Sequence, residues 1–136
     1  MLKEQTVNYY QQGYNCAEAM ILGGDVYYEL NLPKESFLTM AAFGGGMNRE
    51  DLCGAISGGV ALLGLIFVKN RSYESEIIKE ITQEYVDRFE SSMGSLNCKI
   101  LKDSHRNEVE KCASVVDASS RILEEIVEKY KTYRVK

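Results

Sequence analysis

Four cysteines are the residues of this 136-residue chain with the widest chemistry: Cys16, Cys53, Cys98 and Cys112. A deprotonated thiol is both a nucleophile and a metal ligand. No two of the four stand in a CxxC pair, so their spacing indicates neither a thioredoxin-type motif nor a zinc ribbon. If the fold gathers all four, they would suit thiol–disulfide chemistry, a zinc ion or an iron–sulfur cluster.

Cys53 follows a glycine triplet and a charged turn, and it opens the segment CGAISGG. The start of a helix has unpaired N–H groups and the positive end of the helix dipole, and both favour a thiolate. We therefore predict that Cys53 is the poised, attacking thiolate. A helix start at Asn48 would place it in the second turn, and a start at Asp51 or Leu52 would place it in the first. The alternative is a small, buried, apolar thiol.

The segment after Cys53 predicts a buried central helix. It is the most apolar part of the chain, yet it contains Gly54, Gly58, Gly59 and Gly64. Glycine inside a helix costs ~1 kcal/mol relative to alanine, so these positions need a packing reason. Residues four apart share one helix face, where a missing side chain lets another backbone approach.

The other segments also predict helices, and none shows the alternation of a strand. Asn15 looks like an N-cap with Glu18 as its capping-box partner, which places Cys16 at the first helical position. Cys112 falls on the core-facing stripe of the last helix. Helices are expected over residues 2–12, 16–30, 33–43, 73–93 and 105–133, the last one capped by Asp103 or Ser104. The prediction is an all-α fold, an irregular bundle of five to seven helices in a single domain, 1–136.

Net charge and the distribution of apolar residues argue against some classes of function. The net charge of −4, with scattered lysines and arginines, argues against nucleic-acid binding. The apolar run 52–68 is rich in glycine, so we expect no membrane insertion. The polar N-terminus has no signal-peptide core, which predicts a cytoplasmic location. Cysteines there are more often free, redox-active or metal-binding than locked in disulfides.

Taken together, these segments resemble the C_GCAxxG_C_C family of small redox-active proteins, whose hallmark is four cysteines and a CGAxxG motif. The resemblance covers residues 8–126. Its elements are Cys16 in GYNCAEA, Cys53 in CGAISG after FGGG, Cys98 in GSLNC and Cys112 in KCASVV. The resemblance implies a redox role for the four cysteines.

Three hypotheses follow. In the first, Cys53 attacks a disulfide and Cys16, Cys98 or Cys112 resolves it, as in a thiol-dependent oxidoreductase acting on a small molecule or a redox partner. In the second, the four cysteines ligate zinc or an iron–sulfur cluster. His105 could replace one ligand, although a lone histidine near a helix start is more often solvent-exposed. In the third, the chain is a non-enzymatic binding module or a homo-oligomer, and its nine tyrosines suit such an interface.

Four charged residues near the cysteines could assist this chemistry: Glu18, Glu50, Asp51 and Arg49. The carboxylates could transfer protons, but capping helix N-termini is their more common role. Arg49 could pair with a thiolate or an anion, although a surface salt bridge is the ordinary expectation.

Overall fold

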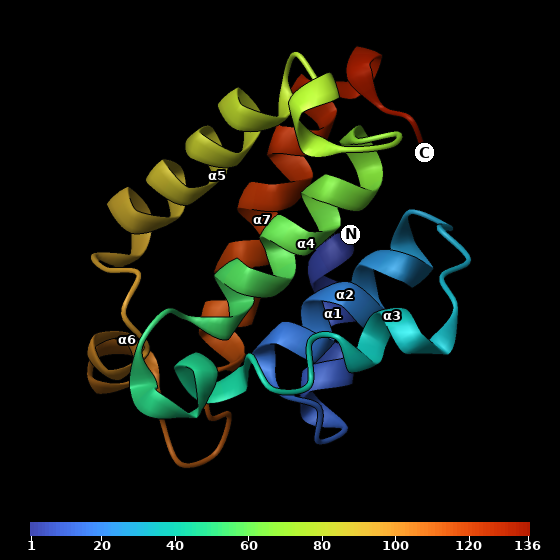
Figure 1. Ribbon diagram of the computed structural model, residues 1–136. Helices are drawn as coiled ribbons and strands as arrows, with labels where there is room; N and C mark the ends of the chain where they lie inside the picture. Colours follow the sequence, from blue (N-terminus) through green and yellow to red (C-terminus); the bar gives the residue numbers. More distant parts are fainter.

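The computed structural model describes residues 1–136 and consists of helices without β-strands (Figure 1). The α-helices are α1 Leu2–Gln11, α2 Cys16–Tyr27, α3 Lys34–Leu38, α4 Gly54–Phe67, α5 Ile78–Met93, α6 Cys98–His105 and α7 Ala113–Lys129. Three single turns complete the chain: η1 Gly46–Glu50, η2 Ser72–Glu74 and η3 Lys131–Tyr133. The all-α class is confirmed. With the single turns included, the number of helical elements is slightly above the predicted five to seven.

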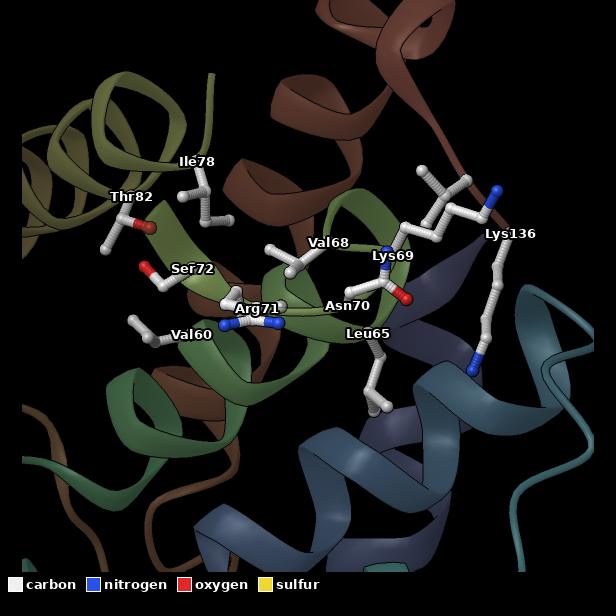
Figure 2. A pocket seen from close by; sticks show the side chains of 12 residues that line it. Val60, Leu65, Val68, Lys69, Asn70, Arg71, Ser72, Ile78, Thr82 and Lys136 are labelled. Atoms are coloured by element: carbon white, nitrogen blue, oxygen red, sulfur yellow. The ribbon is translucent and has the colours of Figure 1, made fainter. Parts of the chain in front are cut away.

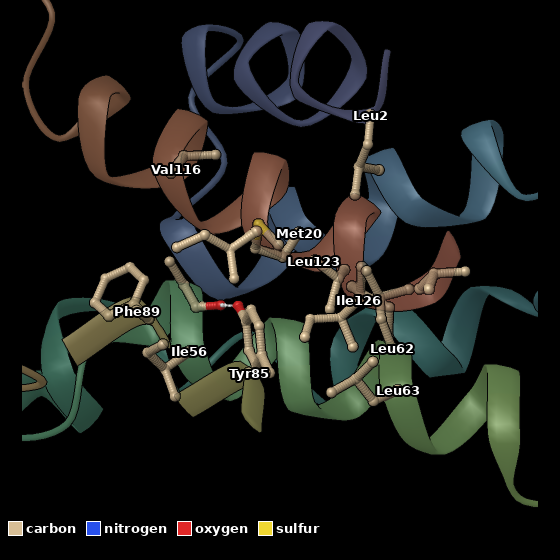
Figure 3. Packing of buried hydrophobic residues seen from close by; sticks show 14 of the residues in the cluster. Leu2, Met20, Ile56, Leu62, Leu63, Tyr85, Phe89, Val116, Leu123 and Ile126 are labelled. Carbon is tan, nitrogen blue, oxygen red and sulfur yellow. Dashed lines mark hydrogen bonds between the residues drawn. The ribbon is translucent and has the colours of Figure 1, made fainter. Parts of the chain in front are cut away.

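Helix α4 contacts α2, α5 and α7, while α1 packs on α2 and α7 (Figure 1). The buried hydrophobic side chains form one cluster of 25 residues. Figure 3 shows Phe89 of α5 near Ile56 of α4, and Tyr85 of α5 pointing into the middle of the cluster. In the middle of this cluster, the Tyr85 hydroxyl donates to the Ala55 carbonyl. The core therefore includes side chains from α1, α2, α4, α5, α6 and α7.

The glycines of the CGAxxG motif have a packing role. A Cβ atom at Gly58 would lie 2.5 Å from the carbonyl oxygen of Ala17, and one at Gly54 would lie 3.4 Å from the Cβ of Cys16. Both of these α2 atoms, the Ala17 oxygen and the Cys16 Cβ, belong to the first turn of that helix. The two glycines thus let α4 approach the start of α2 closely, and this approach brings the segment that carries Cys53 next to Cys16.

The start of α4 differs from every predicted position, because the helix begins at Gly54 and Cys53 is its N-cap. The preceding residues cannot begin a right-handed helix. Gly46, Met47 and Asn48 have φ values of 62°, 60° and 57°, which is the left-handed region. The segment after these residues pairs with the segment before α6 through a single antiparallel β-bridge between Leu52 and Asn97.

The predicted last helix was wrong in its first part. Asp103 and Ser104 do not cap it but lie inside α6, and residues 106–112 form a loop before α7. The Asn107 side chain accepts hydrogen bonds from the backbone N–H groups of Val109 and Glu110, at 3.0 and 2.7 Å. Such Asx bonding competes with the helix. Cys112 is therefore the N-cap of α7 and not part of a helical stripe.

Smaller boundary differences occur elsewhere. Helix α2 ends at Tyr27, α3 ends at Leu38 and α5 begins at Ile78, so each is shorter than predicted. The Asn15–Glu18 capping box is confirmed. No helix has the length and the apolar character needed to cross a membrane.

Candidate functional site

All four cysteines line one pocket of about 350 Å³, and each stands at the start of a different helix. Cys16 and Cys98 are the first residues of α2 and α6, while Cys53 and Cys112 are the N-caps of α4 and α7. Four helix N-termini, each with unpaired N–H groups and a partial positive charge, therefore meet around the sulfurs. The pocket is completed by Tyr10, Gly13, Tyr14, Asn15, Gly45, Gly54, Leu101, Lys102, Arg106, Lys111 and Val115.

Cys16 is placed by the capping box of α2. The Asn15 side chain accepts from the Glu18 N–H at 2.8 Å, and the Glu18 carboxylate accepts from the Asn15 N–H at 3.0 Å. The Asn15 amide also donates to the Ala41 carbonyl at 3.0 Å, which ties the cap to the chain after α3. Both ends of the Asn15 side chain are thus used, and the backbone next to Cys16 is fixed.

Cys53 and Cys98 are brought together by the bridge between their two segments. The Cys53 N–H donates to the Leu96 carbonyl at 2.8 Å, and the Cys98 N–H donates to the Asp51 carbonyl at 2.5 Å. Side chains alternate between the two sides of an extended pair. Cys53 and Cys98 therefore leave the bridge on the side opposite to its central residues, Leu52 and Asn97, and both reach the pocket.

Cys112 has the most polar surroundings of the four. Arg106 donates a hydrogen bond from Nη1 to the Cys112 sulfur at 3.4 Å. The Cys112 N–H donates to the Tyr10 hydroxyl at 3.0 Å, so this tyrosine of α1 anchors the start of α7. The loop that precedes α7 holds Arg106 and Cys112 on the same pocket wall.

These surroundings separate the thiols by acidity. The pKa of Cys112 lies well below its ordinary value, because the neighbouring Cys16 thiol and the Arg106 guanidinium both favour its thiolate. The pKa of Cys16 is raised, because the neighbouring Cys112 sulfur favours the protonated form of Cys16 and because burial disfavours a charge. Cys16 and Cys112 therefore form a thiol–thiolate pair in which the negative charge resides on Cys112.

The prediction that Cys53 is the poised thiolate does not agree with these surroundings. Burial raises the pKa of Cys53 to about 11, although the N–H groups of Ala55 and Ile56 point toward its sulfur and partly offset this effect. Its side chain is 4% exposed and that of Cys112 is 7% exposed, so the two thiols differ in their polar neighbours and not in exposure. Burial also raises the pKa of Cys98. The cost of desolvating a charge here exceeds the benefit of a helix start.

The metal interpretation needs the four cysteines, Cys16, Cys53, Cys98 and Cys112, to act as joint ligands for zinc or an iron–sulfur cluster. No three side chains of His, Cys, Asp or Glu are grouped so that they could hold a metal ion. His105 is 3.1 Å from the Met93 carbonyl and does not line the pocket. The residues therefore do not fit a metal centre in this geometry.

The four charged residues singled out in the sequence lie outside the pocket lining. Glu18 caps α2, Glu50 pairs with Lys102 at 3.6 Å, and Arg49 pairs with Asp51 at 3.5 Å on the surface. The charged residues that do line it, Lys102, Arg106 and Lys111, were missed by sequence reasoning. Their place depends on the loop 106–112, whose Asn107 was the available signal.

A larger hollow of about 900 Å³ lies at the other end of α4 (Figure 2). Figure 2 shows Val60, Leu65 and Val68 on its apolar side and Lys69 and Arg71 near its rim. Its lining includes no Cys, His, Asp or Glu residue. The cysteine pocket is therefore the candidate functional site.

The fold and the site define a class: small helical proteins in which four cysteines at four helix starts surround one pocket. The chain matches the family model described as "Putative redox-active protein (C_GCAxxG_C_C)" over residues 14–126, and it belongs to that family. This membership supports a general redox role. Neither the comparison with curated proteins nor the comparison with solved structures gave a match.

Proposed function

We propose that this protein carries out thiol–disulfide exchange, with Cys112 as the attacking sulfur and Cys16 as the resolving sulfur. The observation that carries the proposal is the hydrogen bond from Arg106 to the Cys112 sulfur at 3.4 Å, on the wall of a pocket that Cys16 also lines. The neighbouring Cys16 thiol further lowers the pKa of Cys112. An attacking thiol must be ionised at working pH, accessible and close to a second thiol.

The exchange takes two steps. The Cys112 thiolate attacks one sulfur of a disulfide substrate, whose S–S bond breaks, and one half leaves as a thiolate while a mixed disulfide forms on Cys112. The Cys16 sulfur then attacks Cys112, the second half leaves, and a Cys16–Cys112 disulfide forms. The proton of Cys16 passes to one of the two departing thiolates. The protein loses two electrons and the substrate gains them.

Arg106 and Tyr10 act on the first step. Arg106 faces the Cys112 sulfur, so its charge stabilises the thiolate before the attack. The Tyr10 hydroxyl accepts the Cys112 N–H at 3.0 Å and so fixes the backbone that carries the attacking sulfur. Cys53 and Cys98 are buried, protonated thiols on the same pocket and have no part in these two steps. The proposal therefore replaces Cys53 by Cys112 as the nucleophile.

The proposal includes a cytoplasmic location and a single domain over residues 1–136. An enzyme whose cysteines must be returned to free thiols after each cycle suits a reducing compartment. The single buried cluster supports one folding unit. A protein of this kind would need a reductant, such as a dithiol protein or a small thiol, to restore Cys16 and Cys112 after each cycle.

The test uses fully reduced protein and a neutral disulfide reagent, dithiodipyridine, followed by peptide mapping of the product. We expect rapid loss of two thiols and a Cys16–Cys112 bond. Cys112→Ser should abolish the fast phase, whereas Cys98→Ser, a matched change on the same pocket, should keep it. Four thiols that react no faster than free cysteine would overturn the proposal and favour a non-enzymatic binding module.

A further inference from the structure

The cysteine pocket carries a charge opposite to that of the whole protein. The chain has a net charge of −4, yet the pocket is lined by three cationic side chains, Lys102, Arg106 and Lys111, and by no carboxylate. The charged residues of the pocket come from α6 and the loop after it, so they lie together on one wall. Such a concentration of one sign in a concave site attracts ligands of the other sign.

Lys111 is held in place by its backbone. It exchanges two backbone hydrogen bonds with Asn107, at 2.9 and 3.3 Å, and its φ of 55° is left-handed. A lysine in this conformation is uncommon, and the loop fixes it directly before Cys112. The backbone around the attacking sulfur thus places a cation next to it.

The three cations differ in what already balances their charge. Lys102 is 3.6 Å from Glu50, and Arg106 faces the Cys112 sulfur. Lys111 takes part in no ion pair. The low pKa of Cys112 arises mainly from Cys16 and Arg106, so the charge of Lys111 is not needed to explain it. The charge of Lys111 is therefore available to a ligand in the pocket.

Building on the proposed exchange, we propose that the substrate of this pocket is a small disulfide that carries negative charge, such as a carboxylate. Its anionic group would lie against Lys111 and Lys102, and its S–S bond would face Cys112. The volume of about 350 Å³ is at the lower end of small-molecule sites, which run from ~300 to ~1,000 Å³. Tyr10 and Tyr14 supply flat walls for the rest of such a molecule.

The test compares three disulfide reagents on the reduced protein: anionic dithiobis(nitrobenzoate), neutral dithiodipyridine and cationic cystamine. Each rate is divided by the rate of the same reagent with mercaptoethanol, a neutral thiol. At low salt we expect the normalised rate to be about tenfold higher for the anionic than for the neutral reagent, and lowest for cystamine. Added salt should reduce the difference, because it screens exposed charges.

A matched pair of variants locates the effect. Lys111→Gln should lower the anionic-to-neutral ratio by about fivefold. Lys79→Gln, which removes the same charge at the exposed start of α5, should leave the ratio unchanged. An equal normalised rate for the anionic and the neutral reagent, or an equal effect of the two substitutions, would overturn the charge preference while leaving the exchange itself intact. If no reagent yields the Cys16–Cys112 bond, the proposed exchange fails instead.

Discussion

Cys16 and Cys112 come from opposite ends of the chain, yet they line the same pocket, and the interaction between their sulfurs raises the pKa of Cys16 and lowers that of Cys112. One begins α2 and the other caps α7. These opposite pKa shifts make Cys112 the anion and leave Cys16 a protonated thiol. Thiol–disulfide exchange requires this asymmetry, because the attacking sulfur must be ionised while the resolving sulfur stays protonated until the mixed disulfide has formed.

The first prediction concerns the pH dependence of alkylation. The lowered pKa of Cys112, about 5, keeps its thiolate present at neutral pH. The rate of its reaction with iodoacetamide should therefore be flat from about pH 7 to 8 and should fall as pH drops through about 5. Stopped-flow alkylation with mass detection of the modified peptide would measure this. A Cys112 rate that still rises tenfold per pH unit between pH 6 and 8 would contradict it.

The second prediction concerns Arg106. Replacement by Gln removes a hydrogen-bond donor and the positive charge nearest to the Cys112 sulfur. The pKa of Cys112 should rise by about one unit, which corresponds to a loss of ~1.4 kcal/mol in stabilisation of the thiolate. Ultraviolet titration of the thiolate would detect the shift. Arg121→Gln, on the far face of α7, provides the control and should leave the titration unchanged, since its partner is Asp117.

Local features of the chain were predictable from sequence, and long-range ones were not. The Asn15–Glu18 capping box lies within four residues, so its pattern suffices to place Cys16 at a helix start. The role expected of Cys53 depended on its pKa, which burial raises and the N–H groups at the helix start lower. Burial depends on residues far away in the sequence, and its effect on the pKa of Cys53 is the larger of the two.

The site itself shows the same division. The sequence shows four cysteines but not that Cys112 caps a helix, because the Asx bonding of Asn107 interrupts the helical pattern before it. Arg106 and Lys111 become part of the pocket only through that loop. The helix predicted over residues 105–133 included both residues, because nothing in this segment other than Asn107 indicates a turn.

The third prediction concerns Tyr10. Tyr10→Phe removes the oxygen that accepts the Cys112 N–H, and it leaves this donor without its partner at the start of α7. An unsatisfied buried N–H costs ~1–3 kcal/mol, so the free energy of unfolding should fall by about that amount. Urea unfolding would measure it. Tyr14→Phe is the comparison, because the Tyr14 hydroxyl forms no hydrogen bond and its side chain is 41% exposed. Equal losses in the two variants would show that the Tyr10 hydroxyl has no special role.

The fourth prediction separates packing from helix propensity within α4. Alanine favours a helix over glycine by ~1 kcal/mol wherever there is room for its methyl group. At Gly64 a Cβ atom would meet nothing within 4 Å, so Gly64→Ala should raise the free energy of unfolding by up to ~1 kcal/mol. At Gly58 it would lie 2.5 Å from the Ala17 carbonyl oxygen and 2.8 Å from the Cβ of Met20.

Neither contact at Gly58 is with the flexible end of a side chain, so α2 must move away from α4. Gly58→Ala should therefore lower the free energy of unfolding by ~1–3 kcal/mol despite the gain in propensity. It should also slow the reaction at Cys112, because Cys16 stands in the turn of α2 that is displaced. Urea unfolding and stopped-flow alkylation of the two variants would measure both effects. If Gly58→Ala stabilises the protein as Gly64→Ala does, the motif glycines do not act by bringing α2 and α4 together.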